Sequence, residues 1–306
     1  MKKNLSKISI VLFISVAAIV FAVFGLAALF THAVGGSFYF DLIILGIAAL
    51  FTGAILILGS SAFSPVFSDA LIVMRRLLRF ESLSNPLLLR LSQEAPGTFH
   101  HVINVSILAQ KAAKNIGADT LLVRIGAYYH DLGKLYQPGL FIENQSGDEI
   151  PHSEDSDTIK RDAQRIITHV KKGIEIAAVN HLPNELVNII AEHHGTTRML
   201  YFYEEAKRQG LKVRKTDFKY DGPVPQSKES AIIMLSDSVE AAARAVTFLT
   251  KEAIAELVEN TILDKINEGQ FKSSGLSETD FALIKSSLID TLSSIYHQRI
   301  MVNRHA

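Results

Sequence analysis

The chain has 306 residues, of which 48% are hydrophobic, and its 31 basic side chains balance its 31 acidic ones. This balance argues against a dedicated nucleic-acid binder, which normally carries a basic excess. The absence of cysteine excludes disulfides, zinc fingers and thiol catalysis, so any metal site must use nitrogen and oxygen ligands.

The first 67 residues contain almost none of this charge. Asp41 is the single formally charged residue between positions 8 and 67. Residues 8–30 form an uncharged run of 23 residues, and about 20 apolar residues suffice to span a bilayer. A second apolar run covers residues 42–63. We therefore predict that residues 1–67 form a transmembrane hairpin with two spans.

Basic side chains flank both ends of this predicted hairpin. Three lysines precede the first run, and three arginines follow the second run within residues 75–79. Because flanking lysine and arginine stay on the cytoplasmic side, we expect a multi-pass protein of the inner (plasma) membrane with its C-terminal part in the cytoplasm. A cleaved signal peptide is the alternative for the first run, although such peptides have shorter apolar cores.

The rest of the chain has an ordinary charge content, with 28 basic and 30 acidic side chains, and a helical hydrophobic pattern. Residues 68–82 are expected to form a linker helix, with breaks at Asn85-Pro86 and Ala95-Pro96-Gly97. Thr98 is expected to cap the next helix. The predicted helices then cover about 98–116, 121–133, 159–179, 183–193, 197–209, 228–248, 251–268 and 278–300.

Two segments between these helices are predicted to be loops. Residues 138–158 contain several glycines and prolines, and residues 211–227 are expected to form an exposed loop or a short hairpin. Neither an internal repeat nor a convincing series of strands is present. The predicted fold class is therefore all-α, with a globular domain over residues 83–306.

Histidines and aspartates interrupt or terminate several of the predicted helices. They are His100, His101, His130, Asp131, His169, His193, His194 and Asp237. Each residue alone is more often an ordinary surface or core residue. An unpaired aspartate buried in an apolar helix is costly, however, and metal coordination removes that cost. Facing helices of a bundle build metal sites in this way, and imidazole with carboxylate suits manganese, iron or zinc.

The string His130-Asp131-Leu132-Gly133-Lys134 resembles the signature of the HD-domain metallophosphohydrolases. Further segments resemble the seven-transmembrane HD family, the PgpH-type cyclic di-AMP phosphodiesterases. They are residues 83–88, 94–101, 126–131, 141–145, 193–197, 234–242 and 295–300. The resemblance covers residues 81–301, nearly all of the part that follows the predicted hairpin. It implies an HD-domain helical bundle preceded by the two-helix transmembrane hairpin.

The resemblance also implies a set of metal ligands. Two divalent transition-metal ions, manganese or iron, are expected to be bridged by Asp131. One ion is assigned to His101, His130 and Asp237, and the other to His169, His193 and His194. His100 is left as a packing residue or a neighbour of the ligands.

The implied reaction is hydrolysis of cyclic di-AMP to the linear dinucleotide pApA by a metal-bridging hydroxide. Asp131 and Lys134 are the expected catalytic residues. Lys134 stands three positions after Asp131, within reach of a non-bridging phosphate oxygen, and a solvated lysine is the alternative. Arg244 is expected either to contact phosphate or to form a surface salt bridge.

Other functions stay open at this point. Cyclic di-GMP is the main rival substrate, but enzymes acting on it typically carry Gly-Tyr-Pro where Gly195-Thr196-Thr197 stands here. Another nucleotide phosphohydrolase, or a membrane sensor that binds a nucleotide without cleaving it, are further alternatives. The expected partners are a cyclic dinucleotide and the lipid bilayer, with no nucleic-acid polymer, and a homodimer is left open.

Two features depart from the family pattern. Members usually carry a large extracytoplasmic domain and seven membrane spans, whereas two spans are predicted here, so any input signal must differ. His152 lies in a loop altered from the family's Asn-Pro-His stretch. We expect either a substrate contact or an ordinary loop histidine at that position.

Overall fold

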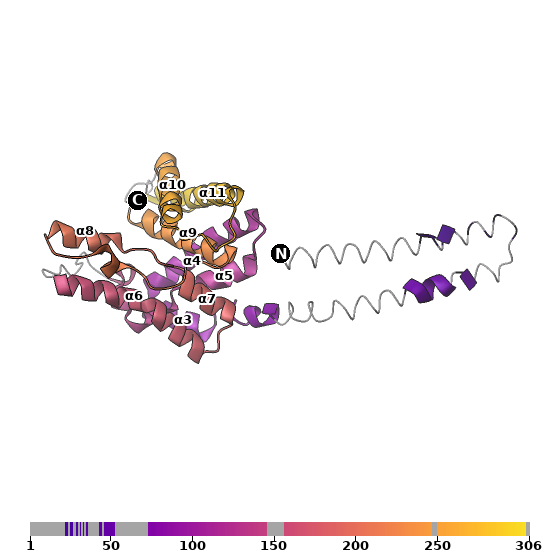
Figure 1. Ribbon diagram of the computed structural model, residues 1–306, viewed down its shortest axis with the longest axis horizontal. Coiled ribbons are helices and arrows are strands. Elements are labelled where there is room, and N and C mark those ends of the chain that lie inside the picture. The colour runs from indigo at the N-terminus through magenta and orange to yellow at the C-terminus, as the bar shows by residue number, and fades with distance from the viewer. Residues whose placement is uncertain are drawn as a thin grey trace. The chain divides into compact units, whose positions relative to one another are not determined.

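The structure is a computed structural model (Figure 1). It describes residues 22–23, 25–26, 29, 31, 33, 35, 43–44, 46–52, 73–145, 156–246 and 250–303. Most of the two predicted spans and the loop that contains His152 lie outside these residues. Within the ranges just given, no helix is long and apolar enough to cross a membrane.

The chain divides into two compact units, Met1–Arg75 and Arg76–Ala306. The boundary falls inside the predicted linker helix at 68–82. Of that helix, residues 73–78 are helical and residues 79–81 form a turn, so the helix ends earlier than predicted.

The described part of the second unit is built from helices. Its α-helices are α3 (Pro86–Glu94), α4 (Pro96–Asn115), α5 (Thr120–Tyr129), α6 (Ser156–Val179), α7 (Asn184–Glu192), α8 (Leu200–Arg208), α9 (Lys228–Arg244), α10 (Lys251–Asn267) and α11 (Glu278–Asn303). Its 3-10 helices are η1 (Leu132–Tyr136), η2 (Pro138–Leu140), η3 (Ile142–Asn144) and η4 (Lys215–Phe218). No strand occurs among the described residues, so the predicted all-α class is confirmed.

Polar side chains begin several of these helices. Asp119 accepts hydrogen bonds from N–H groups of the first turn of α5, and Ser227 and Thr250 do the same for α9 and α10. Such caps satisfy N–H groups that have no partner inside the helix. Asn85 caps α3 in the same way, and Pro86 takes the first helical position, where its missing N–H costs nothing. The sequence prediction read these two residues only as a break and missed α3.

The start of α4 also differs from the prediction. The helix begins at Pro96, so Thr98 lies inside its first turn and does not cap it. The backbone N–H of Thr98 donates to Asn144 Oδ1 at 3.1 Å, and Asn144 Nδ2 donates to Thr98 Oγ1 at 2.9 Å. This reciprocal pair fixes η3 against the start of α4.

Helix α4 packs against α5, α9 and α11, and α10 packs on α9 and α11 (Figure 1). Ile232, Ile233 and Leu235 of α9 belong to one buried hydrophobic cluster with residues of the neighbouring helices. Buried residues occur on nearly every face of α9. Asp237 is therefore held in an apolar setting, where a carboxylate needs a partner.

Candidate metal centre

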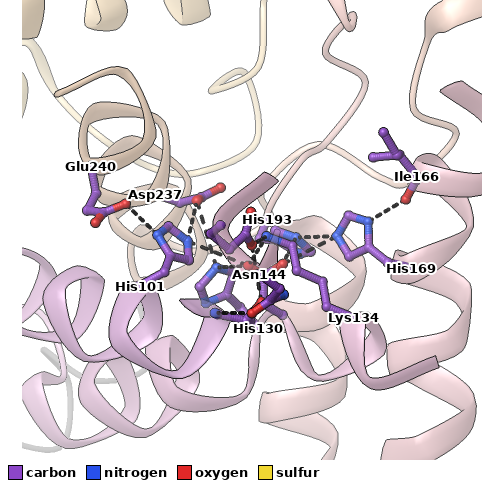
Figure 2. Close-up of polar contacts among 12 residues, drawn as sticks. His101, His130, Lys134, Asn144, Ile166, His169, His193, Asp237 and Glu240 are labelled. Carbon is purple, nitrogen blue, oxygen red and sulfur yellow. Dashed lines mark hydrogen bonds and ion pairs between the residues drawn. The ribbon is translucent and has the colours of Figure 1, made fainter. Parts of the chain in front are cut away.

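Five helical segments bring all seven predicted ligands together inside the second unit, and Figure 2 labels five of them, His101, His130, His169, His193 and Asp237. They are His101 on α4, His130 and Asp131 between α5 and η1, His169 on α6, His193 and His194 after α7, and Asp237 on α9. In each of two groups, the candidate ligand atoms lie within 4.8 Å of one another. All seven side chains are nearly inaccessible to solvent except His194, which is 23% exposed.

The first group gathers around His101. Its Nε2 atom lies 3.0 Å from Asp237 Oδ1 and 3.5 Å from Asp131 Oδ2. His130 Nε2 lies 3.4 Å from the same Asp131 oxygen and 3.8 Å from Asp237 Oδ1. Both Nε2 atoms are buried without a hydrogen-bond partner, which is uncommon for buried polar atoms.

Asp131 reaches the second group through its other oxygen, which lies 3.4 Å from His169 Nε2 and 3.7 Å from His193 Nε2. These two histidines place Nδ1 against the carbonyls of Ile166 and Ile190, at 2.6 and 2.8 Å. A carbonyl only accepts, so each Nδ1 carries the proton and each Nε2 is an acceptor. The two Nε2 atoms face each other at 3.2 Å and cannot hydrogen-bond. A cation removes this conflict, and the donor set therefore fits a metal ion.

The two groups differ in charge. Burial lowers the pKa of His130, but the carboxylates of Asp131 and Asp237 outweigh it and raise that pKa to about 10. The pKa of His101 is also raised, because its contacts with the carboxylates of Asp237 and Glu240 outweigh burial. In the second group, burial and the neighbouring histidines lower the pKa of His193 to about 3. Near pH 7 the metal-free protein therefore has positively charged histidine in the first group, whereas His193 in the second group is neutral.

A close contact between η1 and α6 brings Asp131 against His169. A Cβ atom on Gly133 would lie 1.8 Å from the backbone oxygen of His169 and 2.5 Å from the backbone nitrogen of Gly173. No side chain fits at these distances. The glycine after the His-Asp pair thus permits the backbone approach that joins the two ligand groups.

Lys134 points back toward the ligands (Figure 2). Its Nζ lies 2.7 Å from Asp131 Oδ2 and 2.6 Å from Glu143 Oε1, and the side chain is 12% exposed. Burial opposes the charge, but these two carboxylates raise the pKa of Lys134 and keep it protonated. The alternative of a solvated lysine is therefore wrong, while the predicted phosphate contact stays a prediction.

Glu143 and Tyr220 border the centre, although the sequence did not predict a role for either. Glu143 on η3 bonds Lys134, and its second oxygen lies 3.8 Å from a guanidinium nitrogen of Arg244. Tyr220 is buried, with its ring tilted 32° over the ring of His194 at a centroid distance of 4.3 Å. The prediction of an exposed loop or a short hairpin over residues 211–227 is therefore wrong about the exposure of Tyr220.

A third unassigned neighbour is Glu240. It accepts a hydrogen bond from His101 Nδ1 at 2.5 Å. The available signal was its position three residues after Asp237, because residues at this spacing share a helix face. His100, by contrast, is exposed on α4 and belongs to neither ligand group.

A cavity of about 470 Å³ adjoins the centre. Its walls include Phe141, Ile142, Glu143, Arg165, Tyr201 and Phe202. The Phe141 ring lies 5.7 Å from the His169 ring, and Lys134 Nζ lies 4.9 Å from the centre of the same Phe141 ring. The volume of this cavity is in the range of ligand pockets. Because Phe141 lines the cavity and contacts His169, the cavity lies next to the second ligand group.

Residues 98–242 match the family model of the HD domain. The chain is 42% identical over 238 residues to the cyclic-di-AMP phosphodiesterase PgpH of Listeria monocytogenes serotype 1/2a (strain 10403S). The aligned region covers 77% of this chain and 33% of that protein. It is 40% identical over 259 residues to the cyclic-di-AMP phosphodiesterase PgpH of Bacillus subtilis (strain 168), and the aligned region covers 85% of this chain and 36% of that protein. The chain thus spans about a third of the length of these curated relatives.

Two solved structures have a similar fold. The crystal structure of the L. monocytogenes PgpH HD domain aligns with a TM-score of 0.66 at 42% identity, over 70% of this chain and 100% of that chain. The same domain in complex with cyclic-di-AMP aligns with a TM-score of 0.65 at 41% identity, over 70% and 98%. The chain described here therefore belongs to the HD-domain family.

Proposed function

We propose that this protein is a metal-dependent phosphodiesterase that hydrolyses cyclic di-AMP to pApA. The observation that carries the proposal is the pair of ligand groups approached by the two oxygens of Asp131. His101, His130 and Asp237 would hold one divalent ion, and His169, His193 and His194 would hold the other. Imidazole and carboxylate suit manganese or iron. When bound, two such ions polarise a phosphodiester and lower the pKa of water.

The chain's own residues prepare this site. Asp131 offers one oxygen to each group and so sets how far apart the groups lie. An ammonium group has three donors, and Lys134 directs two of them at Asp131 and Glu143. We assign its third donor to a non-bridging phosphate oxygen of the substrate. Because its pKa is raised by these carboxylates against the effect of burial, Lys134 stays positive near neutral pH.

The choice of substrate rests on the relatives and on the adjoining cavity. The relatives are cyclic-di-AMP phosphodiesterases, and the HD domain of one was solved in complex with cyclic-di-AMP. The cavity offers the aromatic side chains of Tyr201 and Phe202 to a nucleobase, and stacking on aromatic rings is a common way to hold a base. Cyclic di-GMP is the alternative substrate, disfavoured by Gly195-Thr196-Thr197.

We also propose that the catalytic domain, residues 83–306, is cytoplasmic and anchored in the inner (plasma) membrane. The anchor is the hairpin in residues 1–67, followed by the linker at 68–82. Two features of the sequence support this placement. Positions 8–67 contain a single charged residue, Asp41, and basic residues flank the stretch. The lipid bilayer is then a partner of the protein, and pairing of two hairpins would give a homodimer.

Purified full-length protein, stripped of metal and reloaded with manganese, should convert cyclic di-AMP to pApA faster than it cleaves cyclic di-GMP. Product analysis by chromatography measures both rates. Binding of cyclic di-AMP without linear product would favour the sensor alternative, and faster cleavage of cyclic di-GMP would overturn the substrate. Bis(p-nitrophenyl) phosphate, a diester without bases, serves as the control for a working metal centre.

Metal binding should release protons, because the metal-free protein holds protons on His130 and His101. The pKa of His130 is about 10 and that of His101 is raised, whereas burial keeps the pKa of His193 and His194 low. A histidine nitrogen must lose its proton before it binds a metal. Manganese affinity should therefore fall as the pH falls below 10, with release of roughly one to two protons near pH 7.

Calorimetric titration of manganese in buffers of different ionisation enthalpy counts these protons. Heats that are the same in every buffer at pH 7 would contradict the assignment of His101 and His130 as ligands.

A further inference from the structure

The ligand histidines are held in two different ways (Figure 2). His130, His169 and His193 each direct Nδ1 at a backbone carbonyl three residues earlier in the chain. His101 directs Nδ1 at the carboxylate of Glu240, 2.5 Å away and 139 residues further along the chain. Among these four histidines, His101 is therefore the one whose orientation depends on a charged side chain.

Glu240 is itself firmly held. Its side chain is 5% exposed, and its second oxygen accepts a hydrogen bond from Asn104 Nδ2 at 3.2 Å. His101 and Asn104 stand three residues apart on α4, as Asp237 and Glu240 do on α9. One face of α4 thus meets one face of α9, which presents to His101 a candidate ligand carboxylate on Nε2 and a second carboxylate on Nδ1.

We propose that Glu240 is a positioning residue that sets the metal affinity of the group formed by His101, His130 and Asp237. The inference rests on the proposed metal centre. By accepting from Nδ1, Glu240 keeps a proton on that nitrogen, so that Nε2, on the side of Asp237, is the nitrogen free to lose its proton to a metal ion. Its negative charge also makes Nε2 a stronger ligand than a carbonyl partner does. In the second group, His169 and His193 have carbonyl partners on Nδ1 instead.

A merely structural role would give a different result. If Glu240 served only to tie α4 to α9, its loss would lower the stability of the metal-free protein and leave metal affinity unchanged. If it positions His101, its loss weakens one of the two metal sites. Metal affinity is therefore the property to measure, and it does not require any substrate.

The test is calorimetric titration of manganese into metal-stripped, full-length Glu240→Gln, which keeps the size of the side chain and removes its charge. We expect one of the two sites to bind manganese about 10–100-fold more weakly and the other to be unchanged. Glu229→Gln is the matched control, because Glu229 lies in the first turn of α9 and accepts from the backbone N–H of Asp119 at 3.0 Å, away from the ligands. It should bind both ions as the wild type does.

Two unchanged affinities in Glu240→Gln would overturn the inference, as would equal weakening in Glu229→Gln. A second measurement uses the unsubstituted chain. Nitrogen NMR of histidine-labelled, zinc-loaded protein should show His101 protonated on Nδ1 and bound to metal through Nε2, and a bare Nδ1 would overturn the inference. A wild-type protein that binds manganese but leaves cyclic di-AMP intact would refute the proposed substrate and leave Glu240's role standing.

Discussion

Asp131→Asn should lower kcat/KM for cyclic di-AMP at least about 10³-fold, which corresponds to about 4 kcal/mol of transition-state stabilisation. The two oxygens of Asp131 face different ligand groups, at 3.4 Å from His130 Nε2 and 3.4 Å from His169 Nε2. The amide keeps the shape of the side chain but removes the negative charge from both groups. Steady-state kinetics and metal analysis of the purified variant would measure the two effects, with fewer than two ions expected per chain.

Asp119→Asn is a suitable control for this variant. Asp119 caps α5 by accepting from the N–H groups of Leu121 and Leu122, and asparagine caps a helix about as well as aspartate. Activity and metal content should therefore stay near those of the wild type. An Asp131→Asn protein with two bound ions and near-normal activity would refute Asp131 as the ligand common to both groups.

Gly133→Ala should reduce the free energy of unfolding of the second unit by about 3 kcal/mol. The added methyl group would lie 1.8 Å from the backbone oxygen of His169 and 2.5 Å from the backbone nitrogen of Gly173. Because both neighbours are backbone atoms, no side-chain rotation relieves the overlap, and η1 must move away from α6. The same movement separates Asp131 from His169, so manganese binding should weaken as well.

Denaturant unfolding of the metal-free protein, followed by circular dichroism, measures the loss of stability. Gly139→Ala is the matched control, because a Cβ atom at Gly139 meets nothing within 4 Å. Its midpoint should differ from that of the wild type by no more than the equivalent of about 0.5 kcal/mol. Equal midpoints for the two variants would show that the η1–α6 contact tolerates a side chain.

That the seven candidate ligands gather at one site could be predicted because these residues stand out in the sequence. His130-Asp131 lies in a recognisable string, and Asp237 is conspicuous inside an apolar helix. The remaining contacts depend on tertiary packing. Glu240 is one of several acidic residues on the helices, and its contact with His101 arises only when α9 packs on α4. Likewise, Tyr220 sits in a polar segment whose composition resembles that of an exposed loop.

Helix boundaries show the same division between local and tertiary information. The signals that start α3 are local. Asn85-Pro86 can be interpreted as a cap followed by a first-turn proline as readily as a break. At α4 the misleading residue was Thr98, a good capping residue by type. Its hydrogen-bonding groups are used by Asn144, 46 residues away. Local rules cannot anticipate that partner.

The order in which the candidate ligands occur along the chain affects when the proposed metal sites are complete. His101 and Glu240 are separated by 139 residues, and Asp237 on α9 is the last of the seven ligands to leave the ribosome. Closing so long a loop costs chain entropy, and such distant contacts form late in folding. The complete set of candidate ligands thus exists only in the folded chain, and the proposed ions would bind that state. By mass action they stabilise only that state, so the metal supply of the cell would govern the lifetime of the protein as well as its activity.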